Sequence, residues 1–146
     1  MDSKQTSRRP LRAGSLPELL GYRLRLAQQA VFRDFAASVH GLTPGRVGLL
    51  IHIEANPGVT QSRLAEAAGR DRSTMVGVVD KLEARGLIER RRGADRRTNG
   101  LWLTRAGRAL LGRALREIGE HEDRIAARLS PAERRQLLAL LAKIAG

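Results

Sequence analysis

The sequence predicts a mainly α-helical protein that carries one small β-hairpin. Apolar residues recur every three or four positions through most of the chain, and this period gives way to a strand-like pattern only around residues 87–103. Hydrophobic residues make up 42% of the 146 residues, but the aromatic ones are only Tyr22, Phe32, Phe35 and Trp102. Leu, Ala, Val and Ile must therefore form most of the core, which favours a helical design.

The N-terminal part of the chain is expected to be a basic arm followed by an amphipathic helix. Residues 1–14 are predicted to be disordered and to carry several cations. Ser15 and Glu18 have the spacing of a capping box, which predicts that a helix opens there, and Gly41 is expected to end it. The apolar residues that follow Ser15 at helical spacing predict one buried face: Leu20, Leu24, Ala27, Val31 and Phe35.

A second helix is predicted to begin at Pro44, with Thr43 as its cap, because proline at the first helical position loses no hydrogen bond. Its apolar residues lie on two sides, which indicates a short helix packed between neighbours. These residues are Val47, Leu49, Leu50, Ile51 and Ile53.

Two further short helices are separated by a tight turn. Asn56-Pro57-Gly58 is a turn signal, after which Thr60 can cap a helix over residues 61–68. Asp71 can cap the next helix over residues 72–85, which Gly86 ends. Two short helices joined by a three-residue turn that contains glycine form a helix-turn-helix pattern. Leu64, Ala65 and Ala68 are expected to face Met75, Val79 and Leu82.

The strand-like stretch and the C-terminal helices complete the prediction. Residues 87–92 and 100–103 are expected to pair as a hairpin around a polar turn at residues 93–99. Thr104 is predicted to cap a long helix that runs to about Leu129. Ser130 and Glu133 form a second capping box, with Pro131 at the first helical position. The last helix carries an apolar stripe of Leu137, Leu140, Leu141 and Ile144.

The charge of the chain indicates a polyanionic partner. Lys and Arg outnumber Asp and Glu by 27 to 15, which leaves a net charge of +12. Such a surplus is typical of nucleic-acid binding and, less often, of binding to an anionic membrane. An arginine-rich composition in a GC-rich genome accounts for the number of arginines, but not for their uneven distribution.

The second helix of the helix-turn-helix has the residue types of a DNA-reading element. Its leading turn is Arg72-Ser73-Thr74, with Gly77 and Lys81 further along. Arginine can contact guanine, hydroxyls can contact base edges or phosphates, and lysine can contact phosphate. Gly77 costs a helix ~1 kcal/mol relative to alanine. A close approach to DNA explains that glycine, and so does a tight contact within the protein.

The predicted hairpin is unusually basic. Residues 85–97 contain six arginines and two acids. A ribbon with an arginine-rich tip suits the minor groove of A·T tracts, where negative potential is concentrated. A solvated hairpin without a partner would normally mix its charges, so we interpret the segment as a DNA-binding wing.

An ordered series of short motifs resembles the multiple antibiotic resistance regulator (MarR) family over about residues 15–146. The motifs are Leu42-Thr43-Pro44, Thr60-Gln61-Ser62-Arg63-Leu64-Ala65, Arg72-Ser73-Thr74, Leu82-Glu83-Ala84-Arg85-Gly86-Leu87-Ile88-Glu89-Arg90, Asp95-Arg96-Arg97 and Leu103-Thr104-Arg105-Ala106-Gly107. The resemblance implies a mainly α fold with a β-hairpin wing, a winged helix-turn-helix, in a cytoplasmic transcription regulator. It also implies repression as the more common outcome.

The resemblance further implies a homodimer on a palindromic operator in double-stranded DNA. Residues 15–42 and 105–146 would form the intertwined helical dimerisation region, and residues 43–104 the DNA-binding lobe. Gln61 and Ser62 join the leading turn described above in the predicted DNA-binding set. The family's Asp-x-Arg wing motif matches Asp95-Arg96-Arg97, so Asp95 would orient the wing. The turn before it is short for the family, and either Arg96 or Arg97 would enter the minor groove.

A small effector, often a phenol or an aromatic carboxylate, is the other expectation from the resemblance. It would occupy a cleft between the dimer helices and the DNA-binding lobe and release the DNA. The candidate lining residues are Tyr22, Arg25, Gln29, Phe32 and His52. The alternative is that the two aromatic residues belong to the core and Arg25 to the surface. The chain has no cysteine, so thiol-based sensing is excluded.

Other classes of function find less support in the sequence. The three histidines are scattered and form no catalytic or metal-binding motif, so neither an enzyme nor a cofactor is predicted. Glu117 and His121 are four residues apart and could share a metal ion, but an exposed charged face is the simpler interpretation. A non-specific architectural nucleic-acid-binding protein remains the alternative. A membrane role is not expected, because neither a spanning segment nor aromatic anchors are present.

Overall fold

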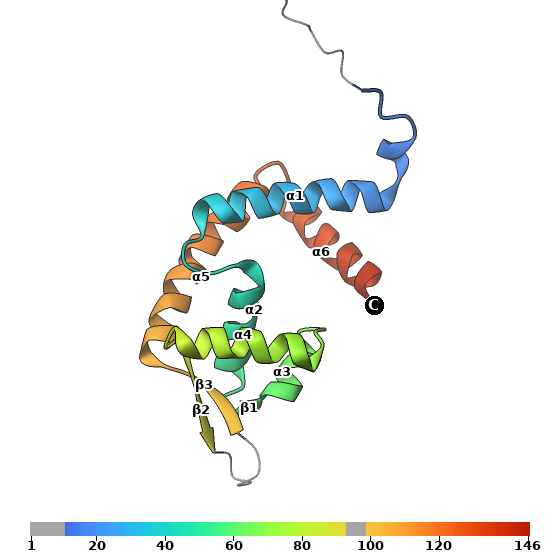
Figure 1. Ribbon diagram of the computed structural model, residues 1–146. Helices are drawn as coiled ribbons and strands as arrows, with labels where there is room; N and C mark the ends of the chain where they lie inside the picture. Colours follow the sequence, from blue (N-terminus) through green and yellow to red (C-terminus); the bar gives the residue numbers. More distant parts are fainter. Residues whose placement is uncertain (1–10, 93–98) are drawn as a thin grey trace, which may run out of the picture. The chain divides into compact units, whose positions relative to one another are not determined.

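The computed structural model describes residues 11–92 and 99–146, and its contacts divide the chain into two units, residues 1–33 and 34–146. The elements of the described residues are shown in Figure 1. They are the 3₁₀-helix η1 (Leu16–Glu18), α1 (Leu20–Ser38), α2 (Pro44–Ala55), β1 (Val59–Thr60), α3 (Gln61–Ala67), α4 (Arg72–Ala84), β2 (Ile88–Arg92), β3 (Asn99–Leu103), α5 (Arg105–Ile125) and α6 (Pro131–Ala145). Among these helices, none is both long enough and apolar enough to cross a membrane.

The first unit differs from the prediction at its start. Ser15 precedes the short helix η1, its side chain makes no capping hydrogen bond, and α1 begins only at Leu20. The backbone of Ser15 is helical (φ −81°, ψ −4°), whereas a capping residue needs an extended conformation, so the predicted capping box at Ser15 and Glu18 is wrong. Of the predicted buried face of α1, only Phe35 is buried, and Leu20 is 61% exposed. The basic arm predicted for residues 1–14 lies mostly outside the described residues.

The core of the second unit gathers apolar residues from α2, α3, α4, the sheet and α5. Leu50, Leu64, Met75, Val79, Leu82 and Leu111 are fully buried in it. The predicted contact between the two helices of the pair is confirmed by this core, which also includes Ala65 and, at its edge, Ala68. Both apolar sides of α2 contribute to the core as expected, through Val47 and Leu50 on one side and Leu49 and Ile53 on the other, although Ile51 remains 40% exposed.

The predicted hairpin belongs to a three-stranded antiparallel sheet in the order β1-β3-β2. Ile88 pairs with Leu103, and Arg92 pairs with Asn99. Strand β1 is absent from the prediction, because two residues are too few for an alternating pattern. It is fixed by the N–H of Gly58, which donates to the carbonyl of Leu101 at 2.9 Å. A side chain at Gly58 would collide with the Trp102 ring, because a Cβ at this position would lie 2.8 Å from the nearest ring carbon.

The start of α5 is locked onto the end of the helix-turn-helix. Thr104 caps α5 by accepting from the N–H of Gly107 at 3.0 Å, and its hydroxyl donates to the carbonyl of Gly86 at 2.6 Å. The backbone of Gly107 approaches so closely that a Cβ there would lie 1.9 Å from the carbonyl oxygen of Leu87. Only glycine permits this approach, which sets the direction in which α5 leaves β3.

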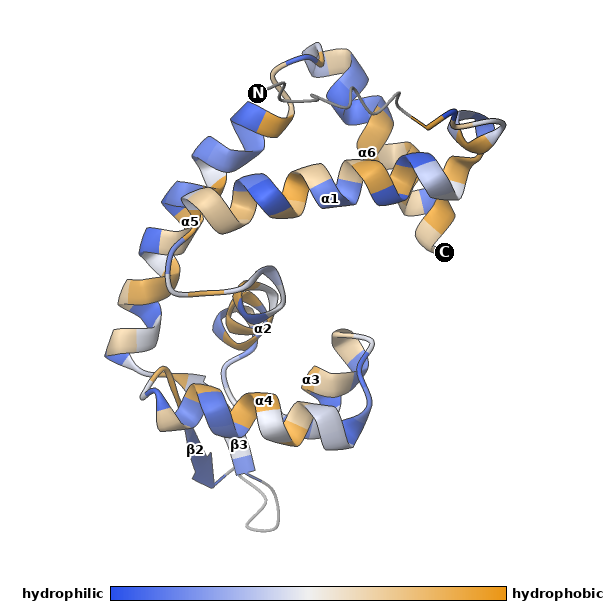
Figure 2. Cartoon of the chain, turned by 45° about the horizontal axis from the view of Figure 1, so that its top comes forward, coloured by the Kyte–Doolittle hydropathy of each residue, from blue (hydrophilic) through white to orange (hydrophobic). Residues whose placement is uncertain are grey.

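Helix α5 is shorter than predicted, and α6 has no buried residue. Helix α5 ends at Ile125 rather than near Leu129, and the chain turns before Ser130. The capping box of Ser130 and Glu133 is confirmed at the start of α6. No residue of α6 is buried, and its leucines and isoleucine are 37–61% exposed. Figure 2 shows these apolar residues along the helix.

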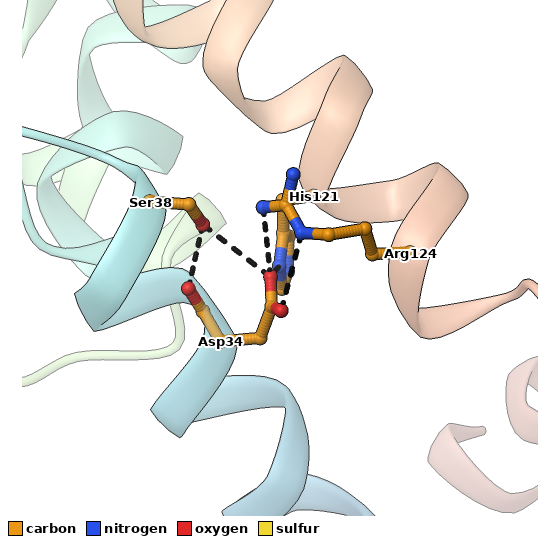
Figure 3. A network of polar contacts seen from close by, with 4 residues as sticks. All are labelled: Asp34, Ser38, His121 and Arg124. Carbon is orange, nitrogen blue, oxygen red and sulfur yellow. Dashed lines mark hydrogen bonds and ion pairs between the residues drawn. The ribbon is translucent and has the colours of Figure 1, made fainter.

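A polar cluster joins the last turns of α1 to the last turns of α5 (Figure 3). Asp34 Oδ1 lies 2.7 Å from Nδ1 of His121, and Arg124 donates to both carboxylate oxygens of Asp34 at 3.0 and 3.2 Å. The hydrogen bonds from Arg124 and then His121 lower the pKa of Asp34 to about 2. His121 is buried and packs edge-on against Phe35, so the expectation of an exposed charged face is wrong for this residue.

Glu117 and His121 do not share a partner: Glu117 contacts His40, whereas His121 contacts Asp34. Its carboxylate accepts from the N–H of His40 at 2.9 Å, which lowers the pKa of Glu117. Glu117 therefore fixes the connection between α1 and α2. Its contact and that of His121 both join neighbouring parts of the fold, and the described residues hold no group of three side chains suited to a metal ion.

Candidate nucleic-acid interface

Helices α3 and α4 adopt the predicted helix-turn-helix with caps that match the sequence. The Thr60 hydroxyl accepts from the N–H of Arg63 at the start of α3. Asp71 caps α4 in the same way through the N–H of Thr74. Buried residues on one side of α4 hold it in the core, so the opposite side and the leading turn are left exposed.

The leading turn of α4 is organised by the Asp71 carboxylate. The Ser73 hydroxyl donates to Oδ1 at 2.6 Å, and the Thr74 hydroxyl donates to Oδ2 at 2.6 Å. These hydrogen bonds, that of Ser73 first, hold the pKa of Asp71 well below its usual range. The carboxylate is therefore ionised at any pH near neutrality and can only accept. The two hydroxyls are oriented by it and keep lone pairs that can accept a further hydrogen bond.

The remaining predicted residues of α4 are also exposed. Arg72 lies at the first helical position, and Lys81 lies in the last turn. A Cβ added at Gly77 would meet nothing within 4 Å. A tight contact within the described chain therefore does not explain Gly77, and its predicted approach to DNA stays a prediction.

The arginines of the hairpin have different surroundings. Arg85 donates to the carbonyl of Gly41 at 2.9 Å, and Arg91 pairs with Glu89 and lies over the Trp102 ring, 5.6 Å from its centre. Arg92 is exposed at the end of β2. The predicted wing residues Asp95, Arg96 and Arg97 lie outside the described residues.

Arg90 is a residue whose role the sequence did not reveal. Its guanidinium pairs with Asp80 at 2.6 Å and with Glu83, and it donates to the side-chain oxygen of Gln61 at 3.3 Å. Gln61 is predicted to contact DNA, and its oxygen instead has this partner inside the protein. Ser62 is exposed. The i,i+3 spacing of the two acids, followed by a strand arginine two residues after buried Ile88, is the signal that could have revealed the cluster.

Four of the predicted effector residues belong to the first unit of the chain and one belongs to the second. On α1, Tyr22, Arg25, Gln29 and Phe32 have spacings of three and four residues, and the Arg25 guanidinium lies 5.1 Å from the centre of the Tyr22 ring. Tyr22 is half-buried, and Phe32 is 51% exposed. In the second unit, His52 lines a cavity of about 350 Å³ together with Asn56, Arg63 and Leu64.

The comparisons with known proteins agree with this architecture. The MarR family model matches residues 40–98. The "Putative transcriptional regulatory protein for hcr operon" of Thauera aromatica is 42% identical over 135 residues, which are 90% of this chain and 81% of that protein.

Solved structures extend the likeness to nearly the whole chain. The transcriptional repressor CouR bound to a 23-mer DNA duplex is 43% identical, with a TM-score of 0.89 over 94% of this chain and 100% of that chain. CouR bound to p-coumaroyl-CoA has a TM-score of 0.85 at 42% identity, over 93% and 98% of the two chains. The PcaV regulator of Streptomyces coelicolor in complex with its natural ligand has a TM-score of 0.83 at 29% identity, over 92% and 97%.

The helix pair, the exposed leading turn of α4 and the adjoining hairpin together define a winged helix-turn-helix protein that binds DNA. Helices before and after that lobe, and relatives that regulate transcription, narrow the class further. This chain belongs to the MarR family of transcription regulators.

Proposed function

We propose that the protein is a homodimeric repressor that binds a palindromic operator and leaves it when a small effector binds. The observation that carries this proposal is the exposed, polar leading turn of α4, set beside a basic hairpin in a fold shared with DNA-bound CouR. A dimer of such lobes meets two half-sites about 34 Å apart, one turn of the double helix.

The DNA-binding roles follow from side-chain chemistry. Arg72 would donate to a guanine, and Ser73 and Thr74 would contact base edges or phosphates. Lys81 and Ser62 would contact the backbone, and Gly77 would allow close approach. Gln61 keeps its amide N–H groups for DNA while its oxygen accepts from Arg90. In the wing, Arg97 or Arg96 would enter the minor groove, and Asp95 would orient it.

The dimer is supported by the apolar surface of the C-terminal helix. Leu137, Leu138 and Leu141 of α6 are 43%, 61% and 37% exposed, although α6 is well capped and regular. A helix whose apolar residues all face solvent lacks the packing that normally stabilises it. We therefore assign residues 15–42 and 105–146 to dimerisation and residues 43–104 to the DNA-binding lobe, as the family resemblance implies.

The effector is proposed to be an aromatic carboxylate, a phenol or an aromatic acyl thioester. The last of these is suggested by CouR, whose ligand is p-coumaroyl-CoA. Tyr22, Phe32 and the cation Arg25 are suited to an aromatic ring that carries a negative charge, and His52 and Gln29 to hydrogen bonds with its polar groups. These five residues remain our candidates for the effector site.

Selection of duplexes from a random DNA pool at near-physiological salt tests the proposal. We expect an inverted repeat whose half-sites lie one helical turn apart, and p-coumaroyl-CoA or p-coumarate should release it. Coenzyme A without an acyl group is a suitable negative control. Recovery of no motif, with binding that simply collapses as salt rises, would instead support the non-specific architectural function.

A further inference from the structure

Arg90 lies in the middle of β2, on the strand face that turns toward α4. Side chains two residues apart share a face of a strand, so Arg90 lies on the same side as the buried Ile88. The side chain of Arg90 is 26% exposed. Its partners come from both helices of the pair: Asp80 and Glu83 from α4, and Gln61 from α3.

The charge of Arg90 is matched inside the protein. Two carboxylates and one amide oxygen accept from the two terminal nitrogens of its guanidinium, whereas Arg92, two residues further along the same face, is exposed. A guanidinium is planar and directs its N–H groups at fixed angles, so several acceptors from different elements define its position closely. Arg90 therefore holds β2 against α4 through these hydrogen bonds. We call Arg90 and its three partners the clamp.

We infer that Arg90 is a positioning residue that fixes the hairpin on α4, so that the two elements meet neighbouring DNA grooves as one rigid unit. This inference rests on the proposed DNA-binding function. Beyond Arg90, the described part of β2 is paired only with β3, so the angle of the strand is set where it contacts α4. A DNA-binding element must be held by locked supporting side chains if it is to reach its target accurately.

The acidic partners give a test in which two explanations predict opposite signs. Removing negative charge near DNA normally tightens binding, because it reduces repulsion of the phosphates. In the double variant Asp80→Asn with Glu83→Gln, the clamp is lost while the net charge becomes more positive by two. We expect operator affinity to fall about tenfold, the size of one lost groove contact. Glu66→Gln, an exposed acid of α3, is the matched control and should bind as tightly as the parent or more tightly.

The operator for this experiment is the duplex that the parent protein selects from the random pool. Hydroxyl-radical footprinting of the double variant should show weaker minor-groove protection beside each half-site, whereas methylation protection of guanine N7 in the major groove persists. Arg90→Met should behave in the same way, and Arg90→Lys should recover part of the affinity. Circular dichroism melts and light scattering report whether each variant is folded and dimeric. Because both acids are partly exposed, at 56% and 38%, their loss should change folding little.

Three results would overturn the inference. Unchanged or tighter operator binding by the double variant means that the cluster does not position the hairpin, although the regulator function stands. An equal loss of major- and minor-groove protection means that the cluster merely stabilises the lobe. If the parent protein selects no duplex at all, the proposed function itself fails and the inference fails with it.

Discussion

Oδ1 of Asp34 lies 2.7 Å from Nδ1 of His121, 87 residues further along the chain, and this contact joins the end of α1 to α5. Arg124 holds the same carboxylate, and together the two residues lower its pKa from 3.8 to about 2. The pair is thus an acid-sensitive link between two helices that flank the DNA-binding lobe.

The lowered pKa of Asp34 predicts how stability depends on pH. A carboxyl with a depressed folded-state pKa contributes stability that is fully present above its unfolded pKa and is lost as pH falls through the folded one. The contribution of Asp34 should therefore be complete above about pH 4 and disappear toward about pH 2. We expect Asp34→Asn to unfold at a lower urea concentration than the parent at about pH 6, with the difference shrinking as the pH approaches about 2. A constant difference across this range would contradict the assignment, and Glu66→Gln serves as the control.

The leading turn of α4 predicts which base groups it reads. The Thr74 hydroxyl proton is directed to Asp71, so the oxygen is left to accept from an exocyclic amine of adenine or cytosine. We expect Thr74→Val to weaken operator binding on the order of tenfold, with little change in the melting temperature. Thr74→Ser should retain most of the affinity. Equal binding by the valine variant in a filter or anisotropy assay would show that Thr74 does not contact the bases or phosphates.

The wing motif predicts that one of its arginines is needed for operator affinity. Arg97→Ala should weaken specific binding roughly tenfold or more, because an arginine in the minor groove responds to its concentrated negative potential. The dimer should stay intact by light scattering. If the operator affinity of Arg97→Ala at physiological salt equals that of the parent, the same measurement on Arg96→Ala decides whether the neighbouring arginine has that role.

Helix α6 predicts the oligomeric state. A chain that ends after Leu129 loses Leu137, Leu140, Leu141 and Ile144, so it should no longer dimerise. A milder version is Leu141→Glu, which places a charge on the apolar stripe, compared with Lys143→Glu on the same helix. Light scattering should report monomers for the leucine variant and dimers for the lysine variant. Dimers in both would mean that the interface lies elsewhere.

The close approach of Gly107 to the carbonyl of Leu87 predicts that a side chain at this position destabilises the protein. Alanine at this position would place its Cβ 1.9 Å from the carbonyl oxygen of Leu87, so Gly107→Ala should destabilise the protein by about 1–3 kcal/mol or more. The matched control is Gly112→Ala on the same helix, where a Cβ meets nothing within 4 Å and should stabilise by up to ~1 kcal/mol. Urea denaturation of both variants measures the difference. Similar midpoints would show that α5 can shift away from Leu87.

Local sequence patterns, above all helix-capping residues and apolar spacing, determined most of the secondary structure. Thr60, Asp71, Thr104 and Ser130 each cap the helix that follows, because a side-chain oxygen placed just before an apolar helical pattern satisfies a free N–H group. The predicted side-chain caps at Ser15 and Thr43 are not formed: the backbone of Ser15 is not extended, and Thr43 is extended but its side chain makes no capping hydrogen bond. The exposure of the leading turn of α4 was also predictable from local sequence, because its polar residues precede the apolar spacing that begins at Met75.

Tertiary structure alone decided which charged residues are matched within the protein. Arg90 and Arg92 lie on the same face of β2, yet the first meets two carboxylates of α4 and the second is exposed. His121 lies on the same helical face as Ile118 and Ile125, but only the end of α1 supplies Asp34 and Phe35 as its partners. Helical and strand periods are set by neighbours along the chain, whereas the partner of a charge is set by which distant element packs against it. The sequence pattern therefore predicted the DNA-binding elements, and only the packing of β2 on α4 revealed how they are held together.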